Sequence, residues 1–202
     1  ERLQIERLDS LLLHRPDALM EPEEVAAAFD HLEQAGKVRH FGVSNQNPMM
    51  MELLKTVVKQ PLKVNQLQLS AAFTPSFEAG FHVNMEGPKA AERDGSVFEY
   101  CRLTDTVIQA WSVLQHGYFK GNFVGKEEFA ALNHVLNDLA KKYQVTPTAI
   151  ALAWVLRYPG KMQAVIGTTK PQHVLEAGKA ATVTLTRKEW YQVYLAAGND
   201  LP

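Results

Sequence analysis

Short apolar runs alternate along the chain with segments in which apolar residues recur every three or four positions. Five runs have the length of a strand and lie at residues 10–13, 40–44, 64–67, 107–111 and 164–166. Helical spacing occurs at about residues 23–35, 48–57, 96–102, 129–143, 147–158, from 171 onward, and at 186–198. The strand runs are continuous rather than alternating, which is typical of a parallel sheet buried on both faces. The pattern predicts an α/β fold of right-handed βα units, arranged as a doubly wound sheet or as a (β/α)8 barrel.

Several predicted helices carry start signals. Pro22 fits the first turn of one helix, and Asn47 followed by Pro48 opens the next. Thr186 and Glu189 have the spacing of a capping box. Between the third and fourth strands, residues 70–95 contain several Gly and Pro residues and are predicted to form a long irregular loop.

The composition is that of an ordinary globular protein. The 202 residues are 46% hydrophobic and 21% charged, and we expect a single domain over residues 1–202. A formal net charge of −1 argues against nucleic acid as a partner, and no apolar run reaches the roughly 18 residues of a membrane span. One cysteine, Cys101, excludes an internal disulfide, and the opening residues ERLQIERL lack the apolar block of a signal peptide. We therefore expect a cytoplasmic protein.

Hydrogen-bonding side chains follow all five predicted strands. In parallel α/β folds the carboxyl ends of the strands meet at one edge, where ligands bind. Each such residue also has an ordinary structural alternative, such as a helix cap for a threonine or a core position for a tryptophan. Their joint placement favours a polar ligand site. The residues at these ends are His14, Ser44, Asn45, Gln66, Trp111, Ser112, Gly167, Thr168 and Thr169.

Other signatures of known chemistry are missing from the sequence. It contains neither G-x-G-x-x-G nor G-x-x-x-x-G-K, which argues against a Rossmann fingerprint and a P-loop. There is no G-x-S-x-G elbow, and Cys101 has no histidine partner at a strand end. The spacing of His31, Glu33 and His40 matches no zinc signature, so we expect no metal.

Stretches at the strand ends resemble the aldo-keto reductase superfamily, and most closely its bacterial NADPH-dependent oxidoreductases. These stretches are LDSLLLHRP (8–16), GKVRHFGVSN (36–45), VNQ (64–66), AWSVL (110–114) and VIGTTK (165–170). Their order and spacing agree over nearly the whole chain. The resemblance implies a (β/α)8 TIM barrel that binds NADP(H) without a Rossmann motif. It also implies the transfer of a hydride from NADPH to the carbonyl of a small substrate, an aldehyde or a ketone.

The resemblance further implies roles for the residues expected at the nicotinamide. By motif match, His14 would be the catalytic histidine that orients and polarises the substrate carbonyl. Ser44, Asn45 and Gln66 would hydrogen-bond the nicotinamide carboxamide. Trp111 would stack on the nicotinamide ring, as an aromatic face suits a planar ring.

The remaining cofactor residues come from the last two matching stretches. Ser112 and Leu114, joined by Gln115, would contact the pyrophosphate. His173 stands where many relatives have Arg, and Ala177 where many have Asn, which argues against tight recognition of a 2′-phosphate. The residues expected to hold the adenosine end are Gly167, Thr168, Thr169, Lys170, His173 and Glu176.

Three of the family's four catalytic residues have no counterpart in these 202 residues. No Asp-Thr/Ala-x-x-Tyr-Gly segment occurs, so of the tetrad only His14 is matched. We therefore expect a partial barrel of about five strands whose first three βα units are absent, which argues against activity of the 202 residues alone. The missing barrel portion or another chain would cover the open strand edges. Two alternatives stay open: a catalytically inactive nucleotide-binding or regulatory module, and a non-functional truncated fragment.

Overall fold

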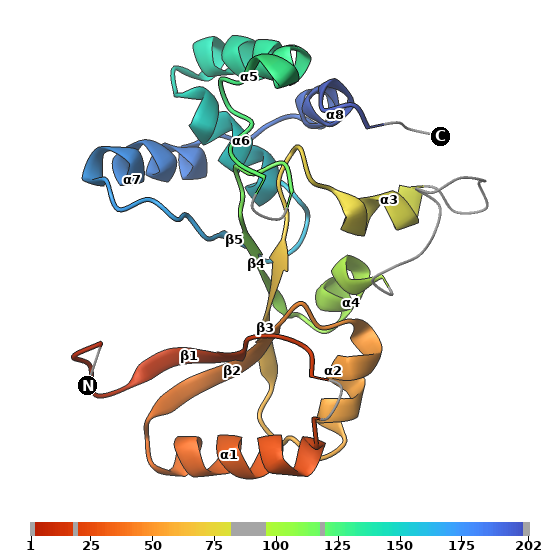
Figure 1. The fold of residues 1–202 in the computed structure, drawn as a ribbon, viewed down its shortest axis with the longest axis vertical. Helices are drawn as coiled ribbons and strands as arrows, with labels where there is room; N and C mark the ends of the chain where they lie inside the picture. Colours follow the sequence, from red (N-terminus) through yellow and green to blue (C-terminus); the bar gives the residue numbers. More distant parts are fainter. Residues whose placement is uncertain (1–2, 18–19, 82–95, 118–119, 200–202) are drawn as a thin grey trace. The chain divides into compact units, whose positions relative to one another are not determined.

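The structure, a computed structural model, describes residues 3–17, 20–81, 96–117 and 120–199. Its strands form one sheet in the order β1-β2-β3-β4-β5 (Figure 1). The strands are β1 (Leu8–Leu13), β2 (Val38–Ser44), β3 (Leu62–Gln68), β4 (Val107–Trp111) and β5 (Met162–Ala164). The α-helices are α1 (Pro22–Gln34), α2 (Pro48–Lys55), α3 (Pro75–Phe81), α4 (Val97–Leu103), α5 (Ala130–Tyr143), α6 (Pro147–Leu156), α7 (Pro171–Gly178) and α8 (Arg187–Ala196). The predicted α/β class with a parallel five-strand sheet is confirmed.

The chain divides into two compact units, which are described one at a time. The first unit comprises residues 1–67 and 92–108, and the second comprises residues 68–91 and 109–202. The prediction of a single domain over residues 1–202 stays a prediction.

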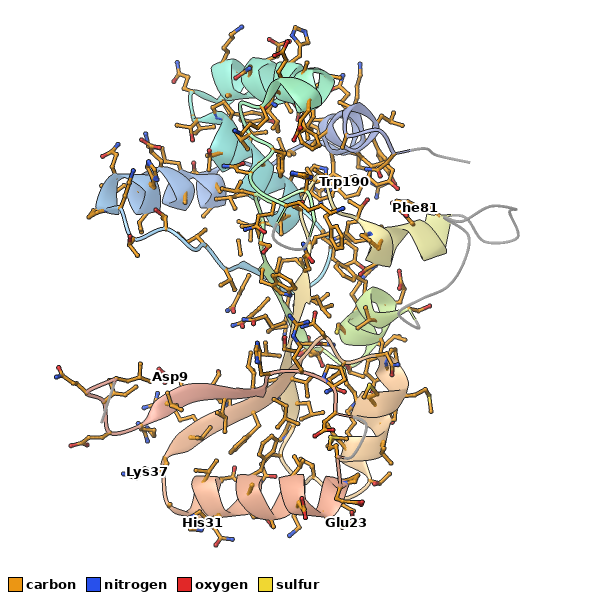
Figure 2. The ribbon with its side chains drawn as sticks, viewed as in Figure 1. Asp9, Glu23, His31, Lys37, Phe81 and Trp190 are labelled. Carbon is orange, nitrogen blue, oxygen red and sulfur yellow. The ribbon has the colours of Figure 1, made fainter. Side chains whose placement is uncertain are left out.

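Helix α1 covers β2 in the first unit because its two faces differ in polarity. Pro22 occupies the first turn, and Glu23 places a negative charge at the positive end of the helix dipole. Glu23 and His31 project from the outer face (Figure 2). On the inner face, Phe29 stacks on Phe41 of β2 with ring centroids 4.3 Å apart. The apolar face of α1 thus packs on the sheet through Phe29, and Val25 and Leu32 pack against the same core.

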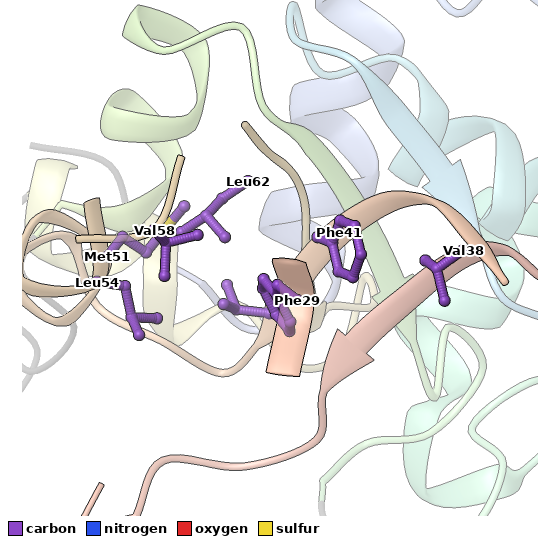
Figure 3. Close-up of a cluster of buried hydrophobic side chains, with 8 residues drawn as sticks. Phe29, Val38, Phe41, Met51, Leu54, Val58 and Leu62 are labelled. Carbon is purple, nitrogen blue, oxygen red and sulfur yellow. The ribbon is translucent and has the colours of Figure 1, made fainter. Parts of the chain in front are cut away.

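The core of the first unit extends from this contact to α2 and β3 (Figure 3). Asn47 caps α2 by accepting a hydrogen bond from the backbone N–H of Met50 at 2.9 Å, which confirms the predicted start. The cap and Pro48 set the direction in which α2 leaves β2, so that its apolar face meets the sheet. The buried residues of this core are Phe29, Val38, Phe41, Val43, Met51, Leu54, Val58 and Leu62.

Gly42 allows the close packing of the first three strands. It is the register partner of Leu12 on β1 and of Val64 on β3. A Cβ atom at this position would lie 2.5 Å from the carbonyl oxygen of Val64 and 2.7 Å from a methyl group of Leu12. Residue 42 therefore has to be glycine for β2 to fit between its neighbours.

Strand β1 departs from the expectation that all strands are buried on both faces. Its residues are half-buried or exposed, and the side chain of Asp9 is exposed beside Arg39, with 3.1 Å between them. The physical reason is its position at one end of the strand order. Within the described ranges, β2 is the strand that pairs with β1, so one edge of β1 has no strand partner there. Strand β5 stands at the other end of the order, and Val165 just after it is 39% exposed.

The second unit has an apolar helix at its centre. Helix α6 begins at the Thr146 cap, which accepts from the backbone N–H of Ala149 at 3.2 Å, and its residues from Ala149 to Val155 are all buried. Helices α5 and α8 pack with it, and α8 opens with the predicted capping box of Thr186 and Glu189. Trp190 on α8 and Phe81 on α3 belong to an aromatic cluster that joins these helices (Figure 2).

Two predicted elements of the second unit are wrong. Residues 75–81 form α3 rather than an irregular loop, because Phe77 packs against Trp154 and Trp190 and supplies tertiary support for a short helix. Residues 82–95 of the predicted loop lie outside the described ranges. The fifth strand occupies 162–164 instead of 164–166. Val165 still donates from its N–H to the carbonyl of Ala110 at 2.8 Å, but residues 166–170 are not in a strand.

Candidate functional site

The corner after β2 brings together three predicted residues of the first unit. Ser44 Oγ donates to the backbone carbonyl of Gln66 at 2.9 Å, and the Asn45 N–H donates to the same carbonyl at 3.0 Å. Asn45 Nδ2 donates in turn to Ser44 Oγ at 2.9 Å. Asn45 has a φ of 56°, a left-handed conformation that asparagine adopts more readily than most residues. The parallel register Ser44↔Gln66 explains why two strand ends share this corner.

His14 lies beside the same edge of the sheet. It directly follows Leu13, the register partner of Val43, so it is level with the end of β2. The imidazole is exposed. The structure therefore places the predicted catalytic histidine at the carboxyl end of β1, in the same unit as Ser44 and Gln66.

The second unit contains a cavity of about 600 Å³. It lies at the end of β4, beside the segment after β5 and α7. The predicted residues that line it are Trp111, Ser112, Leu114, Gln115, Gly167, Thr168, His173 and Glu176. The structure thus gathers residues from two sequence stretches about 50 positions apart around one cavity, as their expected roles require. Lys170 and Thr169, the other two predicted residues of this stretch, are exposed and are not part of the lining.

The β4 side of the cavity is shaped by an irregular turn. Ser112 has a φ of 52°, and its carbonyl accepts a hydrogen bond from the N–H of Gln115 at 2.8 Å. The chain then doubles back, with an isolated antiparallel bridge between Gln115 and Asn122. Ser70 Oγ donates to the backbone carbonyl of Gln115 and ties the turn to the segment after β3. Trp111 and Ser112 line the cavity beside this turn.

The opposite side is formed by the start of α7. The N–H of Lys170 donates to Thr168 Oγ1 at 3.2 Å, and Thr168 Oγ1 lies 3.4 Å from His173 Nδ1. Glu176, one turn further along α7, accepts from Gln172 Nε2 at 2.9 Å. Of the described residues in the lining, His173 and Glu176 can carry a charge, and none is Lys or Arg.

Some lining residues were not predicted. Val113 and Ile166 lie inside matched motifs, so the motifs carried a signal for them. Thr148 and Leu152 come from α6, whose sequence marks a buried helix and nothing about a ligand. The lining residues outside the predicted set are Val113, Asn122, Thr148, Leu152, Val165, Ile166 and Ala177.

A second polar cluster joins α5 to α8 around the buried carboxylate of Glu189. Glu189 is 6% exposed and accepts hydrogen bonds from Lys142 and from Tyr143 Oη, the latter at 2.8 Å. Burial alone would raise its pKa, but the bonds from Lys142, Thr186 and Tyr143 outweigh it and lower the pKa to about 2. Burial and the neighbouring carboxylate raise the pKa of Tyr143. A Glu that is ionised near neutral pH and a less acidic Tyr suit a structural cluster rather than proton transfer.

Comparison with known proteins decides the family. Residues 1–194 match the profile described as "Aldo/keto reductase family". The chain belongs to the aldo/keto reductase family. The resemblance predicted from the strand-end motifs is thereby confirmed.

Curated relatives and solved structures agree with this assignment. The chain is 35% identical to "Oxidoreductase YdhF" of Escherichia coli (strain K12), over 99% of this chain and 61% of that protein. It is 34% identical to a 6-dehydroglucose reductase of Agrobacterium fabrum, over 97% of this chain and 59% of that protein. A crystal structure of an aldo-keto reductase from Klebsiella pneumoniae in complex with NADPH is similar in fold, with a TM-score of 0.72 and 24% identity over 95% of this chain and 59% of that chain.

The match covers only part of the length of each relative. The chain spans about three fifths of each of these three proteins. In the described ranges, each helix is too short or too polar to cross a membrane.

Proposed function

We propose that the protein reduces the carbonyl group of an aldehyde or ketone with NADPH, as part of a complete aldo-keto reductase barrel. The observation that carries this proposal is the cavity of about 600 Å³ around Trp111, Ser112, Thr168 and His173, in a chain of the aldo/keto reductase family. A cavity of this size is suited to one portion of an extended dinucleotide. The NADPH complex of the similar Klebsiella pneumoniae enzyme supports the choice of cofactor.

The residues present fit such a cofactor chemically. The cavity offers an aromatic face at Trp111 for a planar ring, and hydroxyl groups at Ser112 and Thr168 for phosphate oxygens. In the first unit, Ser44 and Asn45 supply a hydroxyl and an amide suited to a carboxamide. When bound, the reduced nicotinamide supplies the hydride. The chain's own part is to bind the cofactor and hold it in one orientation.

For substrate activation we propose a role for His14. Its exposed imidazole at the end of β1 is suited to donate a hydrogen bond to a carbonyl oxygen and so to polarise it. The family's tyrosine acid, with its aspartate and lysine partners, has no matching segment in these 202 residues. We propose that these groups are supplied by further strands of the barrel.

The strand order leaves two sheet edges at which further strands can pair. Within the described ranges β1 and β5 stand at the ends of the sheet, and each has an edge without a strand partner there. Unpaired apolar strand edges tend to recruit another strand. We expect the 202-residue chain to self-associate or to require a complementary segment, which light scattering after size-exclusion chromatography would detect. A stable monomer at all concentrations would contradict this expectation.

The proposed function is tested in two steps. NADPH binding is measured by calorimetry, and carbonyl reduction is followed as the substrate-dependent loss of NADPH absorbance, with a panel of small aldehydes and ketones. We expect binding by the 202-residue chain, and turnover where the complete barrel is present. A folded protein that binds neither NADPH nor NADH would overturn the proposal.

A further inference from the structure

Asn65 is a fully buried polar residue next to the proposed nicotinamide corner, yet no sequence motif assigned it a role. It lies on β3 with 0% exposure. Its side-chain Nδ2 donates to the backbone carbonyl of Gln46 at 2.8 Å and lies 3.5 Å from Met51 Sδ. Gln46 follows Asn45 directly, so this bond fastens the turn that leaves β2.

The same turn is also bonded to Gln66, the residue that follows Asn65 on β3. The backbone carbonyl of Gln66 accepts from both Ser44 Oγ and the N–H of Asn45. Successive side chains of a strand point to opposite faces of the sheet, so the side chain of Asn65 leaves β3 on the face opposite that of Gln66. Asn65 therefore acts on the turn from the α2 side, where Met51 lies.

The backbone at this turn needs such support. Asn45 has a φ of 56°, in the left-handed region, which asparagine tolerates better than most residues but less well than glycine. Such conformations persist where the surrounding structure holds them in place, and they are common at ligand sites. The bond from Asn65 acts at Gln46, the residue immediately after Asn45.

We propose that Asn65 is a positioning residue for cofactor binding: by holding the Gln46 carbonyl, its amide keeps Ser44 and Asn45 oriented toward the nicotinamide carboxamide. This inference rests on the proposed function. Asn65 acts through the turn, and the groups that meet the cofactor are those of Ser44 and Asn45. The bond joins residues 19 positions apart and is buried, so water does not replace the amide when it is removed.

The test replaces the donor by a group whose donor capacity depends on pH. Asn65→Asp keeps the shape, but its carboxyl donates to Gln46 only when protonated, and burial raises the pKa of a carboxyl group from its ordinary value of about 3.9. Cys101 is fully buried, and burial raises the pKa of its thiol to about 11, so this thiol stays protonated throughout the experiment. Binding is measured by calorimetry between about pH 8 and about pH 5.5.

Two ligands separate positioning from general damage. NADPH contains the nicotinamide, whereas 2′,5′-ADP carries the adenosine half alone. Relative to the unsubstituted protein at the same pH, Asn65→Asp should bind NADPH about tenfold more weakly at about pH 8 and recover at about pH 5.5. Binding of 2′,5′-ADP should change at neither pH. Leu54→Ala, which removes packing from α2 but leaves the bond intact, should not lower NADPH affinity selectively.

A second variant keeps the test decisive if a buried carboxylate prevents folding. Asn65→Ser has no ionisable group and is too short to reach Gln46, so it should show the same selective loss without recovery at low pH. Unchanged NADPH affinity in the folded variants, or an equal loss for 2′,5′-ADP, would overturn the inference. Failure of the unsubstituted protein to bind NADPH would instead refute the proposed function, and the inference with it.

Discussion

Trp154 and Trp190 exchange hydrogen bonds through their side chains. The indole N–H of each donates to the backbone carbonyl of the other, both at 3.0 Å. The two rings stack with centroids 4.7 Å apart and 10° between their planes. The pair joins α6 to α8 and satisfies two indole donors where Trp154 is fully buried. It fixes the spacing and the register of these helices at once.

Trp190→Phe should therefore destabilise the protein although an aromatic ring is retained. The change removes one donor and leaves the carbonyl of Trp154 without that bond, which should lower the free energy of unfolding by about 1–2 kcal/mol. Urea unfolding followed by circular dichroism measures the loss. Tyr191→Phe, at the next and more exposed position, is the control and should change stability little. Equal urea midpoints for all three proteins would show that the exchanged indole hydrogen bonds contribute nothing to stability.

Trp111→Ala should weaken the binding of NADPH by about 1–2 kcal/mol through lost stacking and burial. Trp111→Phe keeps a ring at the cavity and should retain most of the affinity. Calorimetry is the suitable measurement, because the substitution also removes a fluorophore. An Ala variant with unchanged affinity would remove Trp111 from the cofactor site.

Cofactor preference should depend on His173. The exposed Lys170 can supply one positive charge near a 2′-phosphate, whereas the lining itself contains no Lys or Arg among its described residues. We expect NADPH to be preferred over NADH by only about tenfold, and His173→Arg to widen the ratio by about another tenfold.

The ratio of dissociation constants for the two cofactors provides the measurement. His134→Arg adds the same kind of side chain on α5, where His134 lies near Asp138 and outside the cavity lining. This control should leave the ratio unchanged. A strong NADH preference in the unsubstituted protein, or an equal effect of both variants, would contradict the prediction.

Acid should destabilise the protein through Glu189. Its folded-state pKa of about 2 lies below its ordinary value of 4.5. A lowered carboxyl pKa stabilises the fold above the unfolded-state value, and this contribution is lost as the pH falls from about 4.5 toward about 2. The difference in unfolding free energy between the protein and Glu189→Gln should thus be full near neutral pH and shrink over this window.

Chemical unfolding at a series of pH values measures that difference. Glu127→Gln removes an exposed carboxylate of the same unit and should show no comparable dependence on pH. The prediction would be wrong if the difference in unfolding free energy between the protein and Glu189→Gln stayed constant from neutral pH down to about 2.

Local signals were enough to predict the helices that begin with a cap. Asn47 and Thr186 each accept from a backbone N–H three residues later, as their predicted roles as helix caps indicated. A cap acts within one helical turn, so it can be recognised without knowledge of the fold. The family motifs likewise predicted that Trp111 and Thr168 lie at one site, and both line the cavity of the second unit.

Tertiary structure alone decided the remaining features. Helix α3 forms because Phe77 packs against Trp154, 77 positions later in the chain. No local sequence pattern predicts that contact. Strand β5 ends early, and β1 stays half-exposed, because pairing depends on which strands are available on both sides. The bond from Asn65 to Gln46 and the contribution of α6 to the cavity depend on neighbours in space. Periodicity reports which face of an element is buried, and only the packed chain determines what that face meets.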